Sequence, residues 1–336
     1  MRIDLARRAA TLALAGMLPL MTLAQAVGQT STPPSAQTWP QRPIRMICPF
    51  PAGGGTDFIA RLAAKHLSDR LGQQVYVENR GGANGAIGLQ ALMQSDPDGY
   101  TIGAISDGPI VANPALYEKL AYQPLRDFIP VAMMIRYPSM LIAHPAVGVR
   151  NVAELIALAK AKPGVLTYSS GGTGNFSHLG LELLALQTGI KLLHVPYRGV
   201  APAVLAVTRG EVDLFCADIT AALGLLQGDK VTALAITSRK RAPALPDVAP
   251  FAELGLPNYE QTGYVGIMVT GGTPAPIIAK LNASINEVLR EPEFSKKFTA
   301  LGYDMVGGTV QGFEKFLEDD IQFYRRLTQA AGLTPE

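Results

Sequence analysis

Short apolar runs alternate with helical patterns along the chain from residue 43 onward. Residues 44–49 (IRMICP) predict a strand, and residues 57–71 repeat apolar positions at helical spacing, with Gly72 as the helix stop. A strand at 74–77, a helix at 85–94 and a strand at 100–105 are predicted next. This regular strand–helix alternation predicts a parallel α/β sheet.

The same alternation resumes and predicts a second α/β unit. Its strands are expected at 131–134, 140–143, 166–169, 192–196, 212–216 and 232–237. Its helices are expected at 152–161, 176–186, 201–208 and 220–226. A strand at 264–269 and helices at 276–289, 293–301 and 312–331 follow. The sequence therefore predicts two α/β units in series and a helical C-terminal segment.

The first 26 residues have the pattern of a secretory signal peptide. Residues 1–8 are basic, and residues 9–26 are apolar, carry no charge and end in Ala-Gln-Ala, a typical cleavage site. A retained membrane anchor is the alternative, but Gly16 and Pro19 interrupt a run that is barely long enough to span. We predict cleavage near Ala26 and export to the periplasm, by the general or the twin-arginine route.

Composition and charge exclude several functions for the processed chain. Cleavage removes three of the 29 basic residues and one of the 27 acidic residues, leaving 26 of each, and this neutral balance argues against nucleic-acid binding. Residues 27–38 predict a flexible leader, and no later stretch is apolar enough to span a membrane. Cys48 and Cys216 fall in predicted core strands, so we expect buried free thiols, with a disulfide between them as the alternative.

Two glycine-rich turns, each between a predicted strand and a predicted helix, are the main chemical signal. They are residues 49–57 (PFPAGGGTD) and residues 169–178 (SSGGTGNFSH). Glycine allows the backbone to approach a ligand closely, and the helix that follows offers unpaired N–H groups with a partial positive charge. Thr56 or Asp57 is the expected N-cap of the first helix. A tight connection without a ligand is the alternative for each turn, but together they favour an anion held between the two units.

Two further turns end at the same predicted edge of the first sheet. Residues 81–85 (GGANG) open a helix, and Ser106, Asp107 and Gly108 follow a strand. Both could line a binding cleft, and a plain turn is the alternative for each.

Motifs of catalysis and cofactor binding are absent from the sequence. It has no phosphate-loop lysine, no serine-hydrolase elbow and no HExxH, and its four histidines are scattered. We therefore expect no catalytic residue, no metal and no cofactor. His66 is expected at the surface or partly packed, and His178 is expected as a structural hydrogen-bonding residue.

The chain resembles the solute-binding receptors of tripartite tricarboxylate transporters, also called Bug receptors. Matching segments run colinearly along nearly the whole mature chain, and the 49–57 block with residues 194–199 (HVPYRG) is the most specific pair. The other matching segments are 39–45, 77–80, 96–101, 113–117, 127–131, 177–179, 234–238, 243–248 and 271–274.

The resemblance implies an α/β fold of the two-lobed periplasmic binding-protein type, type II-like. The ligand cleft then lies between two parallel-type sheets with flanking helices. Lobe 1 is expected at residues 39–138 plus 264–336, and lobe 2 at residues 139–263. The protein is expected to act as a monomer without enzymatic activity and to deliver a small carboxylate to inner-membrane transporter subunits.

The resemblance also implies which residues bind the ligand. Backbone groups of the two glycine turns are expected to bind one carboxylate of the ligand, largely through ordered water. The expected ligand-binding residues are Phe50, Ala52, Gly53, Gly54, Gly55, Thr56, Asp57, Ser106, Asp107, Ser169, Ser170, Gly172, Thr173, Gly174, Asn175, Phe176, His178, Tyr197 and Asp218.

Three departures from the family pattern bear on the ligand. Ala217 and Ala86 stand where the family often has polar residues, and Phe176 replaces a small polar residue. We therefore expect the far end of the ligand to be less polar than an amino acid or citrate, as in an aliphatic or aromatic mono- or dicarboxylate. A core position for Phe176 is the alternative. At the level of function, the alternatives are a ligand sensor for a membrane signalling protein and a secreted enzyme acting on a carboxylate.

Overall fold

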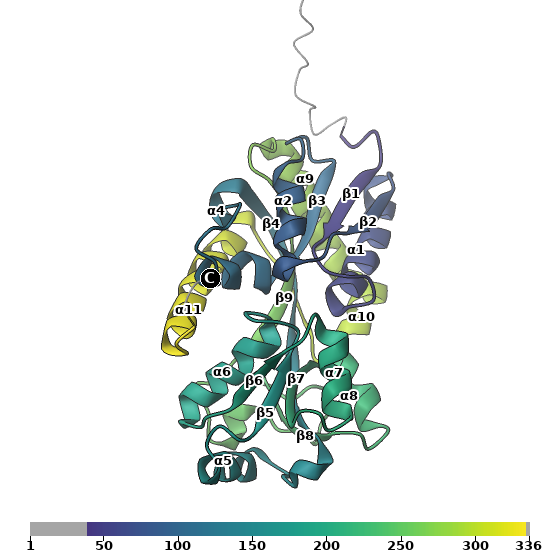
Figure 1. Ribbon diagram of the computed structural model, residues 1–336. Helices are drawn as coiled ribbons and strands as arrows, with labels where there is room; N and C mark the ends of the chain where they lie inside the picture. Colours follow the sequence, from purple (N-terminus) through teal and green to yellow (C-terminus); the bar gives the residue numbers. More distant parts are fainter. Residues whose placement is uncertain (1–38, 334–336) are drawn as a thin grey trace, which may run out of the picture. The chain divides into compact units, whose positions relative to one another are not determined.

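The computed structural model describes residues 39–333, so the predicted signal peptide and leader lie outside the described residues (Figure 1). Its strands are β1 (Ile44–Cys48), β2 (Val75–Asn79), β3 (Thr101–Ser106), β4 (Phe128–Ala143), β5 (Thr167–Ser170), β6 (Leu193–Pro196), β7 (Leu214–Asp218), β8 (Thr232–Ile236), β9 (Thr262–Thr270) and β10 (Asp304–Gly307). Its helices are α1 (Gly55–Leu71), α2 (Ala86–Met93), α3 (Asn113–Leu116), α4 (Pro124–Asp127), α5 (Val152–Ala161), α6 (Phe176–Thr188), α7 (Val200–Thr208), α8 (Ile219–Leu226), α9 (Ala275–Arg290), α10 (Pro292–Thr299) and α11 (Val310–Ala330).

The strands follow the order β2-β1-β3-β9-β4-β7-β5-β6, with β8 and β10 also paired to β4. Parallel pairing joins β2, β1 and β3 at one end and β7, β5 and β6 at the other. Between these two groups, β9 runs antiparallel to β3 and β4, and β4 runs antiparallel to β7. The fold is therefore α/β with a mixed sheet, in which both predicted parallel groups are present and two antiparallel strands join them.

The long strand β4 corrects the sequence prediction. Two strands were expected at 131–134 and 140–143, but one strand of 16 residues passes through both and includes Pro138. Proline is tolerated here because the pairing partner changes at this point: Pro138 faces Thr262 of β9, and Ser139 faces Asp218 of β7. Figure 1 shows β4 passing from the strand group that holds β1–β3 to the group that holds β5–β7.

Helices cover the sheet on both sides (Figure 1). Glycines and capping side chains at their ends determine where several of them start and stop. α1 and α6 each stop at a glycine in the left-handed conformation, Gly72 at φ 65° and Gly189 at φ 68°. α5 begins after Asn151, whose side chain accepts a hydrogen bond from the N–H of Glu154. Among the described residues, we find no helix long and apolar enough to cross a membrane.

Candidate ligand site

The first glycine turn leads into α1 without a side-chain cap. The helix begins at Gly55 with Gly54 as N-cap, so the expectation that Thr56 or Asp57 caps it is wrong. The Asp57 side chain instead reaches back into the turn, where its Oδ2 accepts from the N–H of Gly53 at 2.9 Å. The start of the helix therefore offers backbone N–H groups without a side-chain cap.

Hydrogen bonds to the buried Asp57 carboxylate stabilise the first glycine turn. Its side chain is buried, its Oδ2 also accepts from Arg61 Nε at 3.0 Å, and its Oδ1 accepts from Asn79 Nδ2 at 2.8 Å. Burial raises the pKa of the Asp57 carboxyl, but the hydrogen bonds from Arg61, Gly53 and Asn79 outweigh it and hold the pKa below its usual value. Asn79 also donates to the Phe50 carbonyl at 3.0 Å, while residues 52–55 are exposed and Thr56 is half-buried.

Side chains of the second glycine turn hold it by hydrogen bonds, both within the turn and to neighbouring residues. Ser170 Oγ accepts from the N–H of Gly172 at 3.1 Å and lies 2.6 Å from His194 Nε2. Asn175 caps α6 by accepting from the N–H of Ser177 at 3.0 Å. Ser169 Oγ donates to the Ala203 carbonyl at 3.0 Å. These side chains shape the turn, while Thr173 at its tip is exposed.

His178 has the structural role that the sequence predicted. The N–H of Gly174 donates to its Nδ1 at 3.0 Å, and its ring stacks on His194 with centroids 3.9 Å apart. Burial and the neighbouring His194 lower the pKa of His178 to about 3, so the ring is neutral at physiological pH. A neutral imidazole accepts the Gly174 N–H and thereby orients the turn.

Each glycine turn lies close to residues of the other strand group. A Cβ on Gly174 would clash with Leu116 and would lie 3.9 Å from Asn84 Nδ2, while a Cβ on Gly108 would lie 3.0 Å from Asn84 Oδ1. At the other side, a Cβ on Gly55 would lie 3.8 Å from Asp218 Oδ2. We call this meeting point the turn junction; it comprises residues 49–57, 81–85, 106–108, 170–176 and Asp218.

A row of aromatic rings crosses the turn junction. Phe176, at the start of α6, lies 6.1 Å from Tyr137 of β4, and Tyr137 lies 5.6 Å from Tyr303, measured between ring centroids. Tyr303 Oη then donates to both carboxylate oxygens of Asp218, at 3.0 and 2.9 Å. The row thus links the second turn to Asp218, which faces the first turn.

Tyr137, Tyr303 and Asn84 were not singled out from the sequence. Asn84 lies in the 81–85 turn, which the sequence analysis considered as part of the cleft lining. Its place in that turn was the only sequence feature that pointed to it. Tyr137 lies in the stretch that was expected to separate two strands, and Tyr303 immediately precedes β10, which was not predicted. Both tyrosines reach the junction through long-range pairing, for which a single sequence carries no signal.

The remaining predicted residues lie around the same junction. Ser106 and Asp107 are both buried at the end of β3, and burial raises the pKa of Asp107 to about 6. Tyr324 Oη of α11 lies 3.5 Å from Asp107 Oδ2. Tyr197 is half-buried after β6, and its N–H donates to the Ser170 carbonyl at 2.9 Å.

The other chemical groups considered from the sequence are structural. Cys48 and Cys216 are buried free thiols, as expected, and their pKa values are raised by burial to about 11 and about 12. His66, expected at the surface or partly packed, is more fully buried than that: its ring packs on Phe294, and its Nδ1 lies 2.5 Å from Glu291 Oε2. Within residues 39–333, no group of three or more His, Cys, Asp or Glu side chains is arranged to hold a metal ion.

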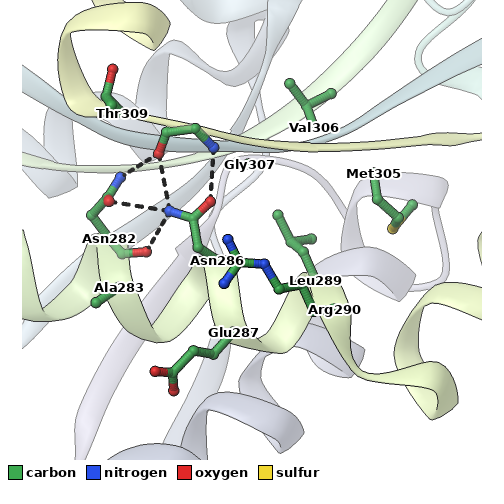
Figure 2. Close-up of a pocket in the computed structure, with 11 residues that line it drawn as sticks. Asn282, Ala283, Asn286, Glu287, Leu289, Arg290, Met305, Val306, Gly307 and Thr309 are labelled. Carbon is green, nitrogen blue, oxygen red and sulfur yellow. Dashed lines mark hydrogen bonds between the residues drawn. The ribbon is translucent and has the colours of Figure 1, made fainter.

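A separate hollow of about 660 Å³ lies between α9 and β10 (Figure 2). Asn286 Oδ1 accepts from the N–H of Gly308 at 2.8 Å, and the side-chain amides of Asn282 and Asn286 both donate to the Gly308 carbonyl. These bonds hold the segment that follows β10 against α9. The hollow contains none of the predicted ligand-binding residues.

The fold and the turn junction together define a class of protein. Two α/β groups joined by shared strands, with a glycine turn of each lying against the other group, are typical of solute-binding proteins. The chain belongs to the tripartite tricarboxylate transporter family receptors, whose family model matches residues 59–333.

Relatives and solved structures agree with this assignment. The chain is 36% identical over 317 residues to protein BugT of Bordetella pertussis, covering 94% of this chain and 97% of BugT. It is similar to the structure of Rhodopseudomonas palustris Rpa4515 with adipate, with a TM-score of 0.83 and 32% identity over 89% of this chain and all of that one. The periplasmic binding protein BugD gives a TM-score of 0.81 and 32% identity, over 89% of this chain and all of BugD.

Proposed function

We propose that the protein is a periplasmic receptor that captures a small carboxylate at the turn junction and delivers it to a tripartite tricarboxylate-type transporter in the inner membrane. The observation that carries the proposal is that each glycine turn lies against the other strand group: Gly55 of the first turn faces Asp218, and Gly174 of the second turn faces Leu116. Family membership and the adipate bound to the similar protein Rpa4515 support a carboxylate as the ligand. The predicted export signal supports a periplasmic location.

The first turn supplies the main attraction for the carboxylate. Gly54 and Gly55 are exposed, and α1 begins there without a side-chain cap, so its N–H groups and the helix dipole favour an anion. Asp57 accepts from the N–H of Gly53, and bonds from Arg61 and Asn79 hold its two oxygens inside the turn. The ligand carboxylate is therefore bound by backbone groups and by the water that they order.

The second turn closes over the ligand from the other strand group. Thr173 is exposed at its tip, and Gly172 has φ 128°, a conformation that favours glycine and leaves the turn backbone accessible. In this proposal residues 39–138 with 264–336 and residues 139–263 move as two lobes. Ligand stabilises the closed arrangement through its higher affinity for that state, and the transporter recognises the closed receptor.

Thermal unfolding with a panel of carboxylates tests the proposal. The mature chain is unfolded and refolded to remove any carried ligand, then mixed with mono-, di- and tricarboxylates. A ligand at about 100 times its Kd adds about 2.7 kcal/mol of stability. That corresponds to a rise in Tm of roughly 5–10 °C for a chain of this size.

A rise in Tm with one class of acid, and recovery of that acid unchanged, is the expected result. Conversion of the bound acid into a product contradicts the receptor and favours an enzyme. No rise with any acid of the panel contradicts a carboxylate site at the turn junction.

A further inference from the structure

The hydroxyl of Tyr137, the central ring of the aromatic row, has no hydrogen-bond partner among residues 39–333. Other tyrosines inside the protein use theirs: the hydroxyls of Tyr122, Tyr259 and Tyr303 each donate to a carbonyl or a carboxylate. Tyr137 is half-buried, so part of its side chain is accessible. Its hydroxyl therefore has hydrogen-bonding capacity that a ligand can use.

The neighbours of Tyr137 place it between the two glycine turns. On one side its ring lies 6.1 Å from the ring of Phe176, which begins α6 directly after the second turn. On the other side it lies 5.6 Å from the ring of Tyr303, whose hydroxyl is already bonded to Asp218. Asp218 in turn faces Gly55 of the first turn. Tyr137 is thus next to the second turn, while Tyr303 and Asp218 separate it from the first.

The backbone of β9 fixes the ring of Tyr137. Tyr137 of β4 pairs with Gly263 of β9, and a Cβ on Gly263 would clash with the ring atoms Cε2 and Cζ and would lie 2.7 Å from Oη. The ring therefore fills the space that a side chain would take at position 263. A donor that is held in one place loses little freedom when a ligand binds.

The phenol of Tyr137 remains a donor at every physiological pH. Burial, and then the charges of Asp107 and Asp218, raise its pKa well above the ordinary value. A neutral phenol can donate one hydrogen bond to an acceptor oxygen.

This inference rests on the proposed function and adds a residue to its site. We propose that Tyr137 is a ligand-binding and specificity-determining residue: its hydroxyl donates to an oxygen at the far end of the ligand, away from the carboxylate that the first turn binds. The ligand then extends from the first turn along the aromatic row toward Phe176. The class of ligand that this arrangement selects is a carboxylic acid with a second oxygen, as hydroxyl, keto or carboxylate, on its chain.

Hydrogen-bond chemistry determines which acids gain from Tyr137. A hydroxyl, keto or carboxylate oxygen accepts from the phenol, whereas a methyl group offers no lone pair. An acid that ends in a methyl group leaves the hydroxyl without a partner in the closed site, which weakens its binding. A site built to pair with a polar group of its ligand rejects the analogue that lacks this group. The rings of the row meanwhile provide apolar surface for the carbon chain.

Tyr137→Phe tests the proposal, because it removes the hydroxyl and leaves the ring in the row. Calorimetry compares hexanoate with 6-hydroxyhexanoate and adipate, and butanoate with 4-hydroxybutanoate and succinate. The wild type is expected to bind the best oxygen-bearing acid at least about ten-fold more tightly than the matched alkanoate. In Tyr137→Phe this ratio should fall by about ten-fold, through loss of affinity for the oxygen-bearing acid.

The stability of the ligand-free protein separates a ligand contact from a structural role. The Tyr137 hydroxyl has no partner within the described residues, so ligand-free Tyr137→Phe should unfold at the same denaturant concentration as the wild type. Tyr76→Phe, at an exposed tyrosine of β2 outside the turn junction, is the matched control. It should retain both the stability and the ligand ratio of the wild type.

The outcomes separate this proposal from the proposed function. An unchanged ligand ratio in Tyr137→Phe, or a wild type that binds alkanoates as tightly as oxygen-bearing acids, overturns the role of Tyr137 and leaves the carboxylate receptor standing. An equal loss of affinity for all acids, together with lower stability, assigns the hydroxyl a structural role and also overturns it. Absence of binding by every acid, in these series and in the wider panel, overturns the receptor and this proposal with it. A ratio that falls in Tyr137→Phe and not in Tyr76→Phe, at unchanged stability, supports both.

Discussion

The hydroxyl of Tyr303 bridges both carboxylate oxygens of Asp218, at 3.0 and 2.9 Å. Tyr303 immediately precedes β10, which pairs with the part of β4 that also pairs with β9, whereas Asp218 ends β7. The bond therefore connects the two strand groups. Burial and the Asp218 charge raise the pKa of Tyr303 far above its ordinary value, so the phenol remains a donor. Asp218 is thus held in place by one tyrosine from the opposite group.

Loss of this hydroxyl should destabilise the protein. Tyr303→Phe leaves the ring stacked on Phe298 but removes a partly buried hydrogen bond to a charged group, which costs about 1.5–3 kcal/mol. Denaturant unfolding measures the loss. Tyr76→Phe, at an exposed tyrosine of β2, is the matched control and should change the free energy of unfolding by less than about 0.5 kcal/mol. Equal stability of the two variants would show that the Tyr303–Asp218 bond contributes nothing.

Gly174→Ala should disturb the contact between the second turn and α3. Gly174 has φ 73°, where a side chain is strained, and its new Cβ would clash with Leu116. Gly164→Ala is a close control, because Gly164 has φ 74° and open space around its Cβ position. Both variants carry a strain of about 1 kcal/mol, and only Gly174→Ala carries the clash as well.

We therefore expect Gly174→Ala to unfold at a lower denaturant concentration than Gly164→Ala. It should also lose carboxylate affinity by about ten-fold or more, because the turn is displaced from the junction. Gly164→Ala should bind the ligand as the wild type does. Identical behaviour of the two variants would contradict the close approach of the second turn to Leu116 of α3.

The stability of the protein should depend on pH through Asp320, a partly buried acid of α11. Burial, and then the charge of Asp107, raises the pKa of Asp320 to about 7, while Arg136 opposes the shift. A folded-state pKa above the unfolded value means that the folded protein holds the proton more tightly. The stabilising contribution of this group is therefore complete below about pH 3.8 and is lost as pH rises through about 7.

Asp320→Asn removes this titration. Relative to the wild type, the variant should gain on the order of 1 kcal/mol between pH 5 and pH 8, allowing for the partial exposure of the side chain. Denaturant unfolding at pH 5, 6, 7 and 8 measures the difference. Asp319→Asn, at the exposed neighbouring acid, should show no such gain, and a gain of equal size there would contradict the assignment to Asp320.

Local features of this protein could be predicted from the sequence because interactions between residues close in the chain determine them. The helix at 152–161 has the predicted bounds, and Gly72 stops α1 as expected, because periodic apolar positions and a left-handed glycine act within a few residues. The two glycine turns were recognised for the same reason.

Features that depend on residues far apart in the sequence could not be predicted. Two strands were predicted at 131–134 and 140–143, but the exchange of β9 for β7 as the partner of β4 keeps one strand continuous through Pro138. Asp57 has a good N-cap side chain, but Gly53, Arg61 and Asn79 hold it inside the turn. Tyr303 reaches Asp218 only because β10 pairs with β4, and β10 is a four-residue strand with a weak pattern.

Phe176 offers the last test, on the apolar part of the ligand. Its side chain is half-buried and its ring lies against Tyr137 at the turn junction. If the ring contacts the carbon chain of the ligand, Phe176→Ala should reduce affinity for the best ligand by about five- to twenty-fold, which corresponds to about 1–2 kcal/mol of lost apolar contact. Short acids that do not reach the ring should lose little. Leu186→Ala, at an exposed apolar residue of the same helix, is the control and should leave all affinities unchanged. Calorimetry with acids of increasing length measures the effect, and a Phe176→Ala variant that binds every acid like the wild type would show that the ring serves only the packing of α6.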